Sequence, residues 1–254
     1  GAARTSLALG DLPGAINRAE AAVRLNPNDS SALTCLAEVQ SARGESDAAE
    51  RAYRAAAAKA ADSSPIWLSL GRMKLGQGRA REAAEVLAQA VGASPRSDEI
   101  QAAYGEALLA SNQAGRALQA FRDAQALAPR NPKHLLRLGH CCRLEGQLDQ
   151  ALSHLLQARD LAPHNDDIVR ELGLVFEARK QWERALEMYT SAVELAPRTA
   201  VNHLRSGVAL KQMKDYAGSV SALEKAVQLD PKNIEAARQL AAVTALNIVQ
   251  GVRL

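Results

Sequence analysis

The chain repeats itself every 34 residues, and this period limits its fold more than any other feature. Five prolines stand 34 residues apart, and Pro27 lies two periods before the first of them. These prolines are Pro95, Pro129, Pro163, Pro197 and Pro231. One column at the same spacing holds only small residues: Ala37, Gly71, Gly105, Gly139, Gly173, Gly207 and Ala241. A fixed period of roughly 20–50 residues indicates structural units that stack on their neighbours.

Each period predicts two helices joined by a short turn. A residue suited to a helix N-cap recurs at Asp29, Ser63, Ser97, Asn131, Asn165, Thr199 and Asn233. A turn residue recurs at each midpoint, at Gly10, Gly44, Gly78, Asn112, Gly146, Lys180 and Lys214. The small residues let the two helices approach closely. We expect a bulkier column to fill the gap between successive pairs: Tyr53, Leu87, Phe121, Leu155, Tyr189 and Leu223.

This period, with its small-residue columns, resembles the tetratricopeptide repeat (TPR) family over the whole chain. The resemblance implies an all-α fold, a right-handed superhelical solenoid of antiparallel helix pairs. We expect a single solenoid domain over residues 1–254, which begins with a truncated repeat at 1–29. The six full repeats are 30–63, 64–97, 98–131, 132–165, 166–199 and 200–233. A terminal helix at 234–249 and an apolar tail at 250–254 complete the chain.

Charge and composition restrict the class of partner. The formal net charge is only +3, so no strong field favours nucleic acid or an anionic membrane surface. No apolar run approaches the roughly 20 residues of a membrane span. The chain has three cysteines, an odd number that does not suit a disulfide framework. This favours a reducing compartment. We therefore expect a cytoplasmic protein without nucleic-acid partners or membrane insertion, and an Ala- and Arg-rich composition typical of bacteria with GC-rich genomes.

The adjacent residues His140, Cys141 and Cys142 raise the question of a metal site, a redox pair or a nucleophile with its base. Cys141 shares an apolar column with Val39, Met73, Ala107, Val175, Ala209 and Val243, and Cys142 shares one with Leu108, Phe176 and Leu210. Both cysteines are interpreted as small buried hydrophobes. A metal site needs three or four converging ligands, and no CxxC or HxxxH spacing occurs. No nucleotide-binding or hydrolase motif is found either, so we predict no catalytic residue, metal site or cofactor within this chain.

Family resemblance places one face of the first helix of each repeat in a concave groove, where TPR proteins usually bind partners. We expect partner contacts there from Arg72, Glu106, Lys133, Arg137, His140, Arg143, Arg170, Arg205 and Lys211. In the later repeats, cations outnumber Asp167, Glu171 and Glu177. Arginine suits bidentate contacts with carboxylates. The groove therefore predicts a scaffold or adaptor for an acidic protein or peptide segment with apolar anchors. The competing interpretation is a solvated face, with Arg72 paired to Glu38 or Glu106 at little gain in stability.

Two known TPR ligand modes do not match. Leu68, Arg72 and Glu106 stand where the chaperone-binding clamp has Lys and Asn, and no Asn ladder like that of O-GlcNAc transferases is present. An alternative function remains: the chain recruits substrate for a larger enzyme, such as a glycosyltransferase or sulfotransferase, whose catalytic domain lies outside this fragment. The apolar stretch at 241–254 predicts that the protein continues or, alternatively, self-associates through this end.

Overall fold

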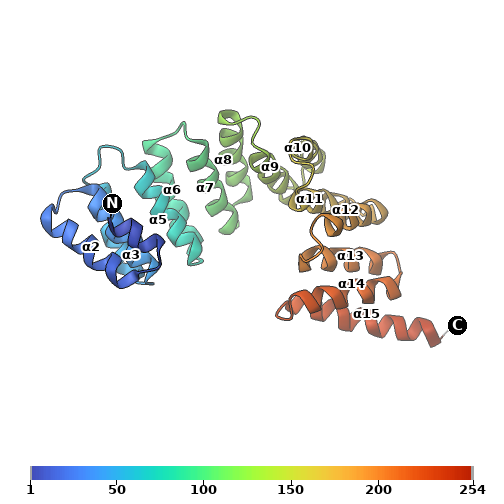
Figure 1. Ribbon diagram of the computed structural model, residues 1–254. Helices are drawn as coiled ribbons and strands as arrows, with labels where there is room; N and C mark the ends of the chain where they lie inside the picture. Colours follow the sequence, from blue (N-terminus) through green and yellow to red (C-terminus); the bar gives the residue numbers. More distant parts are fainter. Residues whose placement is uncertain (1, 253–254) are drawn as a thin grey trace. The chain divides into compact units, whose positions relative to one another are not determined.

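The computed structural model describes residues 2–252, with side chains for 2–249, and these residues form fifteen α-helices and no strand (Figure 1). The odd-numbered helices are α1 Ala2–Ala8, α3 Ser30–Ala42, α5 Ser64–Gly76, α7 Asp98–Ala110, α9 Pro132–Leu144, α11 Asp166–Ala178, α13 Ala200–Gln212 and α15 Ile234–Val252. The even-numbered helices are α2 Leu12–Leu25, α4 Ser46–Ala57, α6 Ala80–Ala93, α8 Ala114–Leu127, α10 Leu148–Leu161, α12 Trp182–Leu195 and α14 Tyr216–Leu229. The predicted all-α class is confirmed.

The helices gather into two compact units, residues 1–128 with α1–α8 and residues 129–254 with α9–α15. Within each unit, an odd-numbered helix packs against the even-numbered helix that follows it, and most even-numbered helices pack against the next odd-numbered one. The last helix, α15, runs to Val252, beyond the end predicted at residue 249. Residues 253 and 254 of the predicted tail lie outside the described residues.

The predicted capping residues begin most of the odd-numbered helices. The side chains of Asp29, Ser97, Asn131, Asn165 and Asn233 each accept a hydrogen bond from a backbone N–H in the first turn. Such bonds satisfy donors that have no partner inside the helix. Ser63 and Thr199 make no side-chain cap. At α5 the carboxylate of Asp62 takes that role, because it accepts from the Ser64 backbone N–H at 2.9 Å.

The midpoint turn of every repeat has a residue in the left-handed region of backbone space. The four glycines have φ between 73° and 79°, while Asn112, Lys180 and Lys214 have φ of 60°, 59° and 65°. Glycine adopts this region without steric cost, whereas a side chain with a Cβ is strained there. The column of predicted turn residues is therefore confirmed at all seven positions, and two of its members are strained lysines.

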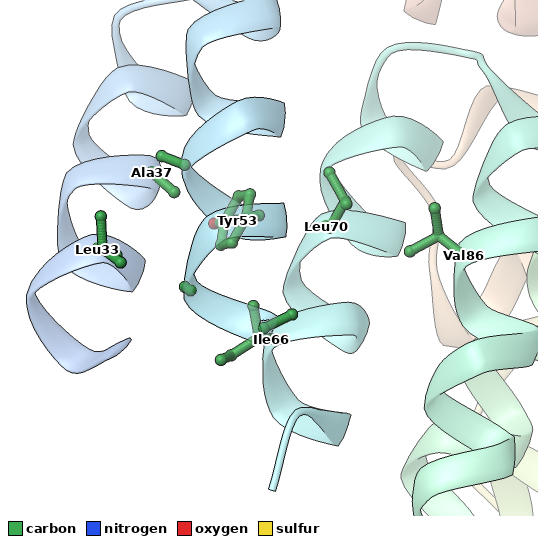
Figure 2. Close-up of a cluster of buried hydrophobic side chains, with 9 residues drawn as sticks. Leu33, Ala37, Tyr53, Ile66, Leu70 and Val86 are labelled. Carbon is green, nitrogen blue, oxygen red and sulfur yellow. The ribbon is translucent and has the colours of Figure 1, made fainter. Parts of the chain in front are cut away.

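Glycine and a bulky side chain pack together inside five of the helix pairs, from α5–α6 to α13–α14. A Cβ on Gly71 would lie 2.4 Å from Leu87 Cγ, and one on Gly139 would lie 2.4 Å from Leu155 Cγ. The bulky column thus packs on the glycine of its own pair, which was not predicted. It also contacts the next pair as predicted, since Tyr53 of α4 lies between Ala37 of α3 and Leu70 of α5 (Figure 2). One side chain therefore joins three successive helices.

Two buried polar side chains find their partners on neighbouring helices. Lys74 of α5 is 1% exposed, and its ammonium lies 2.7 Å from Glu50 Oε2 and 2.9 Å from Glu82 Oε2. Asn202 of α13 is fully buried; its amide nitrogen donates to the Ala192 carbonyl at 3.0 Å and to Asp166 Oδ2 at 3.0 Å. Buried polar groups must find hydrogen-bond partners, and these do so across neighbouring helices. Both residues therefore fix how one helix pair sits on the next.

Candidate partner-binding surface

The odd-numbered helices of residues 129–254 carry seven of the nine predicted site residues. Lys133, Arg137, His140 and Arg143 come from α9, Arg170 comes from α11, and Arg205 and Lys211 come from α13. Helices α9 and α11 are in contact, and hydrogen bonds join α11 to α13. We call these seven residues, together with the other side chains of α9, α11 and α13 that surround them, the inner surface.

Glu171 of α11 binds two of the predicted cationic residues. His140 Nδ1 donates to Glu171 Oε1 at 2.9 Å, and Arg143 Nε lies 3.1 Å from Glu171 Oε2. The carboxylate is only 12% exposed. Burial alone raises the pKa of Glu171, but the hydrogen bond from His140 and the charge of Arg143 outweigh it and leave that pKa below its usual value. Glu171 is therefore ionised at neutral pH and offsets one positive charge of α9.

Glu177, a second carboxylate of α11, binds a cation of α13 in a similar way. Arg205 lies with its guanidinium nitrogen 3.6 Å from Glu177 Oε1, and the Tyr189 hydroxyl donates to Glu177 Oε2 at 2.6 Å. Burial and the bond to Glu177 both raise the pKa of Tyr189, so its hydroxyl stays protonated and remains a donor. The role of Tyr189 could not be foreseen, because its column predicts only a bulky packing residue.

Arg170 is also engaged inside the protein. Its guanidinium contacts Asp167 and donates to Asp166 Oδ2 at 3.3 Å and to Asn202 Oδ1 at 3.0 Å. Arg143, Arg170 and Arg205 therefore all hold partners from α11 or α13. The sequence indicates a run of cations over these helices, and the structure shows that Arg143, Arg170 and Arg205 bind carboxylates of the same surface.

The inner surface also includes other cations and apolar side chains. Lys133 is exposed and Arg137 is half-buried. Lys211 Nζ donates to the neutral Gln239 Oε1 at 3.0 Å, so its positive charge is not offset by this contact. Leu136, Leu174 and Val208 are half-buried and come from α9, α11 and α13 in turn. The inner surface thus combines apolar side chains with cations at its first and last helices.

Arg72 and Glu106, the two remaining predicted residues, belong to residues 1–128. Arg72 of α5 pairs with Glu99 of α7 at 2.8 Å, and Glu38 pairs with Arg4 of α1 at 2.8 Å. Arg72 therefore reaches the first turn of α7, and the predicted pairing of Arg72 with Glu38 is wrong. Both members of the Arg72 pair are more than half exposed, so the pair contributes little stability. Glu106 is half-buried.

The odd-numbered helices α1, α3 and α5 border a hollow of about 330 Å³. Arg4, Thr34, Glu38 and Ser69 line it from the three helices. The hydroxyls of Thr34 and Ser69 donate to backbone carbonyls of their own helices, at 2.7 Å and 2.9 Å. Neither Arg72 nor Glu106 is among the residues that line this hollow.

Cys141 and Cys142 are fully buried and form no disulfide, as their apolar columns predict. His140 directs Nδ1 to Glu171 rather than to a cysteine. Among the described residues, no three His, Cys, Asp or Glu side chains cluster in a way that could hold a metal ion. The interpretation of both cysteines as packing residues is therefore confirmed.

Tandem pairs of antiparallel helices, stacked on one another within each unit, define an α-helical repeat protein. Three features distinguish the chain within that class: its 34-residue period, its glycine contacts and its left-handed midpoint turns. The chain belongs to the tetratricopeptide repeat family: models described as tetratricopeptide repeat match residues 3–162, 145–200 and 202–233. No curated protein sequence matches the chain. Within residues 2–252, none of the helices has both the length and the apolar character that a membrane span requires.

Several solved structures share the fold. A tetratricopeptide repeat protein from Parabacteroides merdae aligns with a TM-score of 0.75 at 15% identity, over 95% of this chain and 96% of that chain. YrrB, described as a TPR protein with an unusual peptide-binding site, aligns with a TM-score of 0.64 at 22% identity, over 76% of this chain and 97% of that chain. PilF of Pseudomonas aeruginosa aligns with a TM-score of 0.62 at 20% identity, over 74% and 86%.

Proposed function

We propose that the chain is a scaffold or adaptor that binds a partner protein or peptide on its inner surface. The observation that supports this most is the row of half-buried apolar side chains, Leu136, Leu174 and Val208, set among charged groups from three helices. Apolar anchors surrounded by polar side chains are the usual make-up of a protein interface. The TPR family and the peptide-binding site described for YrrB agree with this proposal.

The charge of the inner surface supports a preference for acidic segments. Helices α9, α11 and α13 carry six cationic side chains against four carboxylates. Arg143 and Arg205 already hold Glu171 and Glu177. The preference therefore depends mainly on Lys133 and Lys211. Complementary charge of this kind orients a ligand and speeds its association more than it adds affinity.

The test is a selection of binding peptides from a random phage-displayed library, followed by measurement of Kd by fluorescence anisotropy. Lys133→Glu/Lys211→Glu reverses two charges on the inner surface. Arg143 and Arg205 are left intact, because reversing them would leave Glu171 and Glu177 without their partners. We expect this variant to weaken binding of the selected peptides at least about tenfold.

The matched control is Arg198→Glu/Lys225→Glu, which makes the same change in charge at two exposed positions outside the odd-numbered helices. It should bind the peptides like the parent chain. Equal binding by both variants would move the site away from the inner surface. A library that yields no binding peptide would contradict peptide binding itself.

The C-terminal helix supports a second, weaker form of association. Leu246, Ile248 and Val249 of α15 are 40%, 61% and 52% exposed. An apolar end on a repeat array favours association with another surface. We therefore also propose that the chain self-associates through α15. A cytoplasmic location is likewise proposed, because Cys35, Cys141 and Cys142 are free thiols.

A further inference from the structure

Helix α11 is negative between two positive helices. Its four carboxylates, on Asp166, Asp167, Glu171 and Glu177, stand against the single cation Arg170. By contrast, α9 carries three Lys or Arg residues and no Asp or Glu, and α13 carries two cations and no carboxylate. The contacts follow this pattern, because Glu171 holds Arg143 of α9 and Glu177 holds Arg205 of α13. Most of the positive charge that α9 and α13 direct toward α11 is thus offset within the protein.

Glu171 stands at the centre of this arrangement. Each of its two carboxylate oxygens has its own donor: His140 Nδ1 at 2.9 Å on Oε1 and Arg143 Nε at 3.1 Å on Oε2. The side chains of His140 and Arg143 are 27% and 18% exposed, so both still reach the inner surface. A carboxylate from a ligand would find these donors already occupied by Glu171. It would also meet the like charge of Glu171 at close range, which is unfavourable.

Apolar side chains occupy the neighbouring positions. Leu174 lies three residues after Glu171 on α11 and is half-buried, and Val208 occupies the corresponding place on α13. Residues three apart on a helix lie on the same face. The part of the inner surface around Glu171 therefore offers apolar contact but no free positive charge from His140 or Arg143.

We propose that Glu171 sets the charge preference of the inner surface. The partner is a peptide segment with apolar side chains over α11 and with its carboxylates placed to the sides, near Lys133 of α9 and near Lys211 of α13. This inference rests on the proposed function. It goes further, since it assigns one residue that rejects acidic side chains at the centre of an otherwise cationic surface.

The experiment uses the full chain and one peptide selected from the random library. Each position of that peptide is replaced in turn by Glu, and Kd is measured against the parent chain and against Glu171→Gln. Glutamine keeps the shape and one acceptor oxygen of Glu171 but removes its charge. At one or more apolar positions of the peptide, we expect the penalty for Glu to be about tenfold smaller with Glu171→Gln than with the parent chain.

Two further variants make the outcome specific. Glu187→Gln removes the same charge from an exposed position on α12 and should reproduce the parent profile. Arg143→Gln leaves Glu171 with one cationic partner fewer and should increase the penalty for Glu at the same peptide positions. This variant tests the inference in the opposite direction, even if Glu171→Gln folds poorly by circular dichroism.

An unchanged penalty profile in both Glu171→Gln and Arg143→Gln would overturn the role of Glu171 while leaving peptide binding intact. A parent chain that selects no peptide, or selected peptides that bind Lys133→Glu/Lys211→Glu as tightly as the parent, would instead overturn the proposed function, and the inference with it.

Discussion

At the scale of single residues, the midpoint turns show how the repeat tolerates departures from its ideal sequence. Four repeats place glycine in the left-handed conformation, whereas Lys180 and Lys214 adopt it with φ of 59° and 65°. The left-handed region costs an L-residue with a Cβ roughly 1–2 kcal/mol relative to the right-handed one. The fold therefore holds these two lysines in a backbone conformation that is unfavourable for them.

The change Lys180→Gly should stabilise the chain by about 0.5–1 kcal/mol. Glycine relieves the strain of the left-handed conformation, although its more flexible unfolded state cancels part of the gain. Urea unfolding followed by circular dichroism measures the difference in free energy. The converse change, Gly146→Ala, places a Cβ at φ 73° and should destabilise. Equal stability of Lys180→Gly and the parent would show that the turn is not strained.

Two glycines of one repeat predict opposite outcomes for the same substitution. A Cβ at Gly71 would meet Leu87 Cγ at 2.4 Å, whereas a Cβ at Gly92 has no atom within 4 Å. Gly71→Ala should therefore destabilise by about 1–3 kcal/mol through overpacking. Gly92→Ala, inside α6, should stabilise by about 0.5–1 kcal/mol through helix propensity. Thermal unfolding of the two variants compares them directly, and a shift of the same sign in both would contradict the close approach of α5 and α6.

At the scale of helices, buried charge joins α5 to its neighbours. Lys74 forms ion pairs with Glu50 of α4 and Glu82 of α6. Arg54 also forms an ion pair with Glu50, at 2.8 Å. Hydrogen bonds from Arg79 and Lys74 lower the pKa of Glu82 to about 2, so this carboxylate is ionised at neutral pH. Other repeats fill the same place with Leu108, Cys142, Phe176 or Leu210. One repeat thus uses an ion-pair network where four others use apolar packing.

The change Lys74→Met should destabilise the chain by about 3 kcal/mol. Removing the buried ammonium takes away the partner that Glu50 and Glu82 share and leaves them with Arg54 and Arg79 as partners. Loss of one member of a buried ion pair costs more than the pair itself contributes. The double variant Lys74→Met/Glu50→Gln should recover more than half of that loss, because the less exposed of the two carboxylates then carries no charge. Urea midpoints of the three chains test this. A single variant as stable as the parent would show that Lys74 is not held by the network.

The sequence predicts the helices, their caps and their turns well, because these depend on residue type at a fixed place in the period. It does not predict which ion pairs form. Arg72 reaches Glu99 and Lys74 reaches Glu50, since side-chain conformation and the neighbouring repeat decide each contact. A polar residue in a mostly apolar column, as at Lys74 or Asn202, is the only sequence signal of such a contact. The same limit applies to the inner surface, where the positions of cations are predicted but their internal partners are not.

At the scale of the whole molecule, the odd-numbered helices of the two units differ in charge. In residues 1–128 they carry Arg4, Arg72 and the buried Lys74 against Glu38, Asp98, Glu99 and Glu106. In residues 129–254 the helices α9, α11 and α13 carry an excess of cations. Stability in repeat proteins arises mainly between nearest neighbours, so each unit can present its own surface without long-range rearrangement. An acidic partner is therefore expected to contact the second unit.

The most direct test of partner binding on the inner surface is hydrogen–deuterium exchange of the full chain with and without a selected peptide. Slower exchange in α9, α11 and α13, with α10, α12 and α14 unchanged, is the predicted result. Slower exchange confined to the even-numbered helices, or to residues 1–128, would contradict the assignment of the inner surface.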